Sequence, residues 1–183
     1  YAKIKPDFIC LSKGLTSGWL PMSVVLTHDR IYNLFYDDYN TGKSFLHSHT
    51  FSGNALAAAI ALECFAILED EKIIKQVNEK EIILRKFMEE VNQKTHRLVN
   101  IRGIGAIVAA DLALKENEKN QRIGYRIFQH ALDLGAWLRP LGNTIYWLPP
   151  LNITLSTLEE LRDITTLSIK RVFNKKIDLK IKN

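Results

Sequence analysis

An apolar run, Phe8 to Leu11, ends in a turn of small residues whose second member is Lys13. The run follows Pro6-Asp7, and uninterrupted apolar residues bounded by turn formers predict a buried strand. Glycines in the turn let the backbone approach whatever Lys13 meets. On position alone, a lysine that ends a strand most often extends its ammonium group into water. A lysine shielded from water loses its proton more readily, and its neutral amine attacks carbonyl carbons.

A more specific pattern is carried by three segments that are spread along most of the chain: Lys5 to Ser23, Phe45 to Asn54, and Leu138 to Pro150. Together these segments resemble the class III aminotransferases, which are pyridoxal-phosphate enzymes of fold type I. One departure is mild: Ser17-Gly18 stands where many members of that family have two glycines.

The resemblance implies roles for five residues. Lys13 corresponds to the catalytic lysine that binds pyridoxal 5'-phosphate covalently. Thr50 corresponds to the hydroxyl residue that binds the cofactor phosphate from across the interface of a homodimer, so each active site is shared between subunits. Ser48, Arg139 and Tyr146 are expected to bind substrate, and a guanidinium such as that of Arg139 holds a carboxylate through two hydrogen bonds. No metal site is expected.

Several of these residues also have simpler interpretations. A hydroxyl residue that precedes a helix, as Thr50 does, often caps that helix. An isolated arginine usually lies at the surface, which is the plain interpretation of Arg139. His47 and His49 indicate a metal pair only weakly, because no third ligand follows at a suitable spacing. We interpret these histidines as loop residues at the mouth of the active site.

Within the family, the segments around Thr50 and Arg139 most resemble those of enzymes that transfer an amino group from S-adenosylmethionine to 8-amino-7-oxononanoate in biotin biosynthesis, giving 7,8-diaminononanoate. A first alternative is another class III ω-aminotransferase, acting on ornithine, acetylornithine or 4-aminobutyrate, since these enzymes share the lysine segment. A second alternative is a catalytically incomplete fragment that only completes a dimer interface.

The 183 residues suffice for one domain with a core, or for one domain and part of another. The enzymes that the chain resembles are considerably longer, and their cofactor lysine lies past the middle of the sequence. We therefore expect an α/β fold: the C-terminal portion of a fold type I enzyme. Residues 1–95 are expected to form the end of the large cofactor-binding domain, and residues 96–183 a small α+β domain.

Composition favours a soluble, cytoplasmic protein, with 46% hydrophobic and 25% charged residues and no visible signal peptide. The net charge of +5 comes from scattered lysines and a basic C-terminal run that begins at Lys170, which indicates a solvated tail rather than nucleic-acid binding. The longest apolar stretch, Ala55 to Leu68, contains Glu63 and is too short to cross a bilayer. Cys10 and Cys64 lie in apolar contexts and are expected to be buried, reduced thiols.

Hydrophobic periodicity predicts strands and helices in alternation. Strands are expected at residues 7–11, 22–26, 99–102, 107–112, 136–139 and 144–148, and helices at 29–36, 55–68 and 121–134. The apolar face predicted for the helix at 55–68 comprises Leu56, Ile60, Cys64 and Ile67. The apolar face predicted for the helix that follows it comprises Val77, Leu84, Met88 and Val91. A last helix is expected to open with the capping box Ser156 to Glu159 and to bury Leu158, Leu161 and Ile164.

Overall fold

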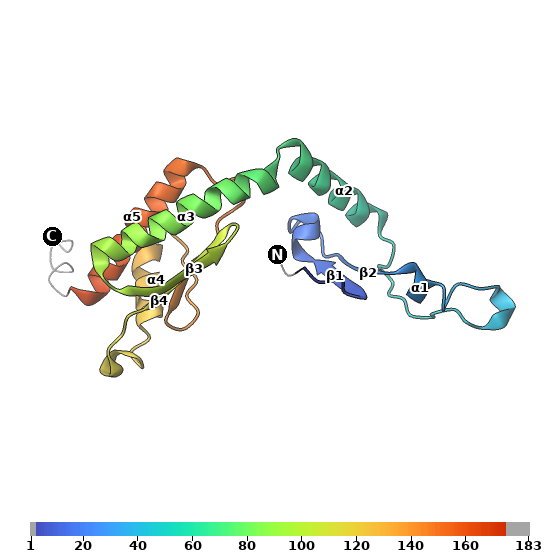
Figure 1. The fold of residues 1–183 in the computed structure, drawn as a ribbon, viewed down its shortest axis with the longest axis horizontal. Coiled ribbons are helices and arrows are strands. Elements are labelled where there is room, and N and C mark those ends of the chain that lie inside the picture. The colour runs from blue at the N-terminus through green and yellow to red at the C-terminus, as the bar shows by residue number, and fades with distance from the viewer. Residues whose placement is uncertain (1–2, 175–183) are drawn as a thin grey trace. The chain divides into compact units, whose positions relative to one another are not determined.

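The computed structural model describes residues 3–174, and these residues form two compact units that divide between Lys72 and Ile73 (Figure 1). Most of the basic run predicted from Lys170 onward lies outside the described residues. Among the described residues, no helix is both long and apolar enough to span a membrane.

The first unit is organised by a β-hairpin. Strand β1 (Phe8–Ser12) pairs antiparallel with β2 (Ser23–Thr27), and the single-turn 3-10 helix η1 (Lys13–Thr16) begins the connection between them. The elements that follow are α1 (Asp29–Tyr32), the 3-10 turn η2 (Tyr39–Thr41) and α2 (Ala55–Asp70). Helix α2 packs against η1. Both strands were predicted within one residue, whereas α1 is shorter than predicted and ends at Tyr32.

The prediction that β1 is buried is wrong in this chain. All five of its residues are exposed, and Phe8 retains 56% of its accessible surface. Among the described elements, β1 makes its main contacts with β2 and η1 and no helix packs extensively on it, so its apolar side chains stay exposed. For the same reason Cys10 is exposed rather than buried, and Cys64 on α2 is half-buried.

The buried face of helix α2 overlaps only in part with the one predicted. Its buried residues are Ala57 and Ala61, whereas Leu56 of the predicted face is 65% exposed. Small side chains let a helix approach a neighbouring backbone closely, and here the neighbour is η1. Ile60 and Cys64 of the predicted face are half-buried beside these alanines, whereas Leu56 and Ile67 are exposed.

The second unit is a layer of helices on an antiparallel sheet of strand order β3-β4-β5. Its elements are α3 (Ile73–Thr95), β3 (Leu98–Ile104), β4 (Ile107–Leu112), η3 (Glu116–Glu118), α4 (Ile123–Asp133), β5 (Thr144–Trp147) and α5 (Leu155–Phe173). Buried and partly exposed residues alternate along β4 and β5, as a sheet with one covered face requires. Helix α5 packs against both α3 and α4, and α3 also contacts β3 and β4.

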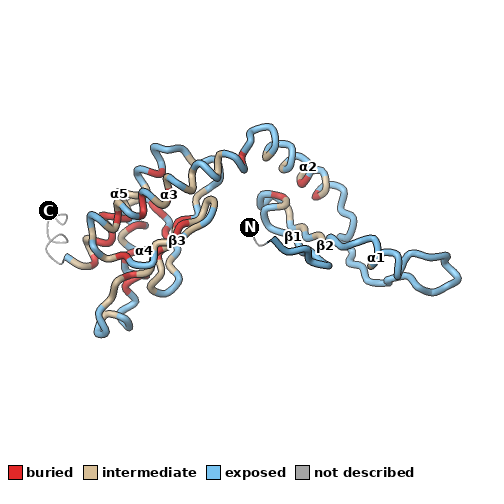
Figure 2. Tube along the Cα trace, viewed as in Figure 1, coloured by how far each residue is buried: buried red, intermediate tan, exposed pale blue. Residues whose placement is uncertain are grey.

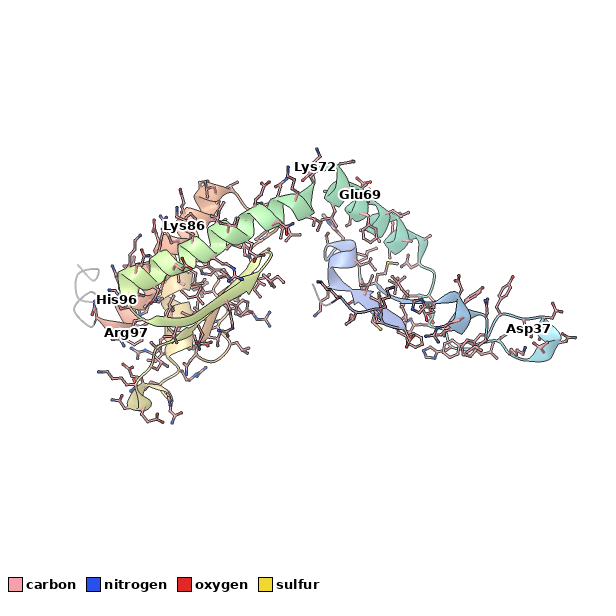
Figure 3. All side chains as sticks on the ribbon, in the orientation of Figure 1. Asp37, Glu69, Lys72, Lys86, His96 and Arg97 are labelled. Atoms are coloured by element: carbon pink, nitrogen blue, oxygen red, sulfur yellow. The ribbon has the colours of Figure 1, made fainter. Side chains whose placement is uncertain are left out.

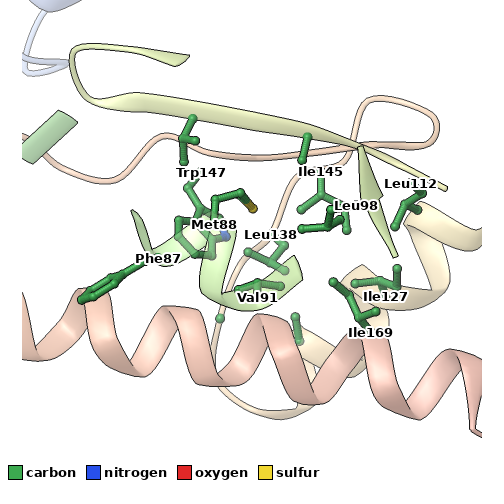
Figure 4. Close-up of a cluster of buried hydrophobic side chains, with 14 of the residues drawn as sticks. Phe87, Met88, Val91, Leu98, Leu112, Ile127, Leu138, Ile145, Trp147 and Ile169 are labelled. Atoms are coloured by element: carbon green, nitrogen blue, oxygen red, sulfur yellow. The ribbon is translucent and has the colours of Figure 1, made fainter. Parts of the chain in front are cut away.

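The core of this unit lies between the helices and the sheet. Figure 4 shows Met88 and Val91 of α3 facing Ile145 and Trp147 of β5, with Ile169 of α5 closing the cluster. The indole N–H of Trp147 donates to Thr165 Oγ1 at 3.1 Å, so the one polar atom of this buried ring is satisfied. The apolar face predicted for α3 is confirmed: Leu84, Met88 and Val91 are buried and Val77 is half-buried. Figure 2 shows that buried residues are concentrated in this second unit.

Helix α3 is followed by a left-handed residue, His96 (φ 52°), whose N–H donates to Asn92 O at 2.7 Å. Asn92 Oδ1 in turn accepts from the N–H of Leu98 at 3.0 Å. Figure 3 labels His96 and Arg97 at this turn into β3. At the opposite end of β3, Gly105 N–H donates to Glu81 Oε2 at 2.6 Å, which ties the β3-β4 turn to α3.

Two local predictions for the second unit are wrong. Residues 136–139 form no strand: the N–H of Leu138 donates to Ala136 O at 3.1 Å instead of to a neighbouring strand, and Pro140 lacks an N–H to donate. Helix α5 begins one residue before the predicted capping box. Its cap is Thr154, whose Oγ1 accepts from the N–H of Thr157 at 3.2 Å. Leu158 is buried as predicted, and Leu161 and Ile164 are half-buried.

The compact units and the predicted domains divide the chain at different places. Helix α3 belongs to the second unit because its apolar face packs on β3, β4 and α5, although the change in sequence pattern comes only after it. The assignment of residues 1–95 to a large cofactor-binding domain and of residues 96–183 to a small domain stays a prediction.

The sheet of the second unit contains a carboxyl group, that of Asp111, whose pKa is strongly lowered. Asp111 of β4 accepts two hydrogen bonds from Arg102 of β3, both at 3.0 Å, and one from Thr144 Oγ1 of β5 at 2.7 Å. The Arg102 guanidinium and the Thr144 hydroxyl lower the pKa of the Asp111 carboxyl to about 2. This carboxylate therefore links all three strands.

Candidate active site

Lys13 borders a hollow in the first unit with a volume of about 1310 Å³. The hollow is lined by Ser12, Lys13, Thr16, Gly18, Leu20, Pro21, Met22, Ser23, Val24, His49, Phe51, Ser52, Gly53, Asn54, Ala57 and Ala58. One wall thus comes from the end of β1 and the turn into β2, and the other from the loop before α2 and the first turn of that helix. Residues far apart in sequence meet around the lysine.

The backbone at Lys13 is in an unusual conformation. Its φ is 54°, in the left-handed region, and Ser17 four residues later has φ 49°. For a residue with a side chain, this conformation costs about 1–2 kcal/mol, so surrounding contacts must hold it. Ser12 just before it remains extended. The chain therefore changes direction sharply at Lys13.

The loop before α2 forms a compact turn on this hollow. His49 N–H donates to Ser52 Oγ at 2.9 Å, and Ser52 N–H donates back to His49 O at 2.8 Å. His49 Nδ1 accepts from the N–H of Phe51 at 3.2 Å, which orients its ring. His49 and Phe51 line the hollow, whereas Ser48 and Thr50 are exposed and lie outside the set of lining residues. The structure therefore brings His49, and not Thr50, to the hollow that Lys13 borders.

Thr50 does not cap α2. The cap is Asn54, whose Oδ1 accepts from the N–H groups of Leu56 at 3.0 Å and Ala57 at 3.3 Å. The simpler interpretation of Thr50 as a helix cap is therefore wrong, and its predicted phosphate contact stays a prediction. The sequence signal for the true cap was an asparagine directly before an alanine-rich helical run.

Arg139 and Tyr146 lie together on a second hollow, of about 550 Å³, in the second unit. Tyr146 is half-buried on β5, where it pairs with Ala109 of β4, and Arg139 is exposed in the segment after α4. The hollow also includes Trp137, Leu148 and Glu160, so its wall is apolar with a few charged groups. This arrangement suits an elongated ligand with a carboxylate end.

A close backbone approach holds the segment that carries Arg139. A Cβ built on Gly124 of α4 would lie 2.2 Å from Gly142 O and 3.3 Å from Pro140 Cβ. Glycine at position 124 therefore lets residues 140–142 rest directly on the helix. Gly124 cannot be singled out from the sequence, because nothing in its local pattern separates it from any helical glycine.

The sequence matches the family described as "Aminotransferase class-III" over residues 1–169. A relative from Helicobacter pylori, named adenosylmethionine-8-amino-7-oxononanoate aminotransferase, is 40% identical over 160 residues, covering 83% of this chain and 35% of the relative. A crystal structure of the enzyme of that name from Methanocaldococcus jannaschii matches with TM-score 0.78 and 34% identity over 91% of this chain and 39% of the other. Acetylornithine aminotransferase from Elizabethkingia anophelis matches with TM-score 0.78 and 26% identity, over 92% of this chain and 42% of the other.

The chain thus has part of the α/β fold type I of the transaminases, which confirms the predicted fold class. The chain belongs to the class III aminotransferase family. It spans 35% of the length of the Helicobacter pylori relative.

Class III aminotransferases depend on pyridoxal 5'-phosphate, and the residues around Lys13 fit that cofactor. The lysine stands at the edge of a hollow large enough for the cofactor, and glycines at positions 18 and 53 leave the adjacent backbone open on the Cβ side. Lys13 is the residue predicted to bind the cofactor covalently. A lysine amine beside an open, glycine-flanked hollow is the donor chemistry that the cofactor aldehyde requires.

Proposed function

We propose that, in the full-length protein, this chain contributes to the transfer of an amino group from S-adenosylmethionine to 8-amino-7-oxononanoate, giving 7,8-diaminononanoate in biotin biosynthesis. The observation that carries the proposal is Lys13 at the edge of the hollow in the first unit. The choice of substrates is supported by the relatives of that name and by the Arg139 segment.

Bound pyridoxal phosphate supplies an aldehyde for covalent attachment and an electron-withdrawing ring that makes the Cα–H bond of an amine substrate more acidic. Lys13 Nζ accepts the proton from that Cα and delivers a proton again when the oxo acid is aminated. Arg139 holds the carboxylate of the oxo acid, and Tyr146 and Ser48 position the substrate. Arg139 and Lys13 lie in different units, so the role of each residue is tested by a separate substitution.

A second candidate is another class III ω-aminotransferase. It is favoured by the acetylornithine aminotransferase structure, which matches with the same TM-score of 0.78 as the Methanocaldococcus jannaschii enzyme. The fold therefore does not separate the two activities. Comparing S-adenosylmethionine with ornithine, acetylornithine and 4-aminobutyrate as donors separates them, and a clear preference for one of the last three replaces our proposal.

The decisive experiment is to reduce the full-length protein with borohydride in the presence of the cofactor and to map the labelled peptide. We expect the label on Lys13, and Lys13→Ala is expected to abolish both the label and the visible absorbance of the bound cofactor. Lys5→Ala, which alters an exposed lysine of the same unit, serves as the matched control and should keep both. Labelling at a lysine other than Lys13 contradicts the assignment.

We further propose that the protein acts as a homodimer in which Thr50 binds the cofactor phosphate of the partner subunit. The proposal is supported by the exposure of Thr50 and by its position outside the lining of the hollow that Lys13 borders in the same chain. Mixing inactive Thr50→Ala and Lys13→Ala subunits should restore part of the activity, because one site of each heterodimer then contains both residues. Verified heterodimers without activity would place both residues in one subunit's site.

A further inference from the structure

The turn that presents Lys13 contains one buried polar side chain, Thr16. Among the residues described in the first unit, only Thr16, Ala57 and Ala61 are buried, and Thr16 retains 2% of its accessible surface. A threonine this deeply buried needs a partner for its hydroxyl group. The hydroxyl donates to Leu20 O at 2.5 Å.

This hydrogen bond spans the turn after η1. Trp19 N–H donates to Thr16 O at 3.0 Å, and Ser17 N–H donates to Gly14 O at 3.2 Å. Together with the bond from the Thr16 hydroxyl to Leu20 O, three hydrogen bonds therefore close the turn that follows Lys13. Two left-handed residues, Lys13 and Ser17, flank the segment.

The other side of the turn is held by packing. Helix α2 contacts η1, and the buried residues of α2 are the small Ala57 and Ala61. A helix face of alanines gives a flat, rigid surface against which the turn is set. Thr16 therefore stands where the closed turn and the helix meet, three residues from the lysine.

We propose that Thr16 is a positioning residue for Lys13: its hydroxyl group, bonded to Leu20 O, fixes the turn that directs the lysine amine into the hollow. The inference rests on the proposed function of Lys13. Thr16 itself reacts with nothing. Its contribution is to the rate at which the Lys13 amine attacks an aldehyde carbon already bound in the hollow, a step in which nitrogen bonds to carbon and water leaves.

The test uses the full-length protein freed of cofactor and then mixed with saturating pyridoxal phosphate. The first-order absorbance change at saturation reports the bond-forming step rather than cofactor affinity. Thr16→Val keeps the shape of the side chain but leaves Leu20 O unpaired, and we expect this rate to fall about tenfold, the effect of losing a buried hydrogen bond. Thr16→Ser retains the hydroxyl group and should restore the rate to within about twofold.

Thr27→Val is the matched control. Thr27 Oγ1 donates to Asp7 O at 2.9 Å in the same hairpin, so this variant also loses a hydroxyl-to-carbonyl hydrogen bond, but far from Lys13 in sequence. Its rate should equal that of the wild type. A merely structural role of Thr16 would lower the melting temperature of Thr16→Val and leave the saturated rate unchanged.

Three results overturn the inference: a wild-type rate in Thr16→Val, an equal loss in Thr16→Ser, or an equal loss in Thr27→Val. If Thr16→Val does not fold, Thr16→Cys takes its place, because a thiol is a weak hydrogen-bond donor, and a wild-type rate in that variant overturns the inference equally. Borohydride mapping of the wild type distinguishes a failure of the proposed function of Lys13 from a failure of the positioning role of Thr16. A label on another lysine removes the proposed function, whereas a label on Lys13 with an unaffected Thr16→Val removes only this inference.

Discussion

Arg139 is exposed at the edge of the second hollow, so its side chain is free to meet a ligand carboxylate. We expect Arg139→Ala to raise the KM for the oxo acid about thirtyfold, since a hydrogen bond to a charged group that bound substrate shields from water contributes about 2 kcal/mol. The half-reaction with the amine donor should stay nearly unchanged. Single-turnover measurements of the two half-reactions check this.

Arg126→Ala on the exposed side of α4 is the matched control and should change neither half-reaction. Equal losses in both half-reactions of Arg139→Ala would mean that the residue supports the fold or the cofactor instead of the acceptor.

Asp111 makes stability depend on pH. Because its pKa is lowered from 3.8 to about 2 by Arg102 and Thr144, the folded protein binds the proton less readily than the unfolded chain. The resulting stabilisation is present above about pH 4 and is lost as the pH falls towards about 2. The Asp111 side chain is 32% exposed and that of Arg102 53%, so we discount the effect for solvent screening to about 1 kcal/mol.

Urea unfolding of Asp111→Asn at pH 7 should show this loss, and the difference from the wild type should shrink as the pH is lowered. In a double-mutant cycle, Asp111→Asn and Arg102→Met should be non-additive, because both remove the same contact. A constant difference between wild type and Asp111→Asn from pH 7 down to the acid range would contradict the pKa assignment.

At the scale of elements, the start of α5 distinguishes two candidate caps. The sequence predicted Ser156, and the structure assigns the cap to Thr154, whose Oγ1 accepts from the N–H of Thr157. We expect Thr154→Ala to lower the free energy of unfolding by about 1 kcal/mol. Ser156→Ala, as the control, should have a smaller effect, and thermal unfolding of both variants measures the order. The reverse order would restore the predicted cap.

At the scale of the whole chain, the two units differ in how much they bury. The continuous core lies in the second unit, whereas the described part of the first unit buries three residues. We expect amide hydrogen exchange in the 183-residue chain to be slow in α3 and β4 and fast in β1 and β2, since protection follows buried contacts. Mass-spectrometric exchange checks this.

Met88→Ala provides the control for that experiment. Met88 is fully buried, and the cavity left by its truncation costs about 2–5 kcal/mol. Exchange should therefore accelerate throughout the second unit while the rates in the first unit stay the same. Similar protection in both units of the unaltered chain would contradict the two-unit description.

Local chemistry allowed much of this structure to be predicted from the sequence. A short, mostly apolar run placed β4, and helical spacing of apolar residues placed the buried face of α3, because that spacing reports which side of a helix avoids water. The lysine turn was also predicted, since an apolar run followed by a lysine and a glycine indicates a strand that ends in a turn. The same order, as part of three motifs, indicated the family that the comparison confirmed.

The features that could not be predicted from the sequence depend on contacts between segments that are distant along the chain. The buried face of α2 is set by η1, so Ala57 and Ala61 are covered and Leu56 is not. The close approach at Gly124 and the burial of Thr16 exist only once two segments have met. The sequence by itself therefore determined most of the elements, the family and the candidate lysine. Tertiary structure decided which faces are covered and which side chains share a hollow, because burial is a property of contacts between segments and not of either segment alone.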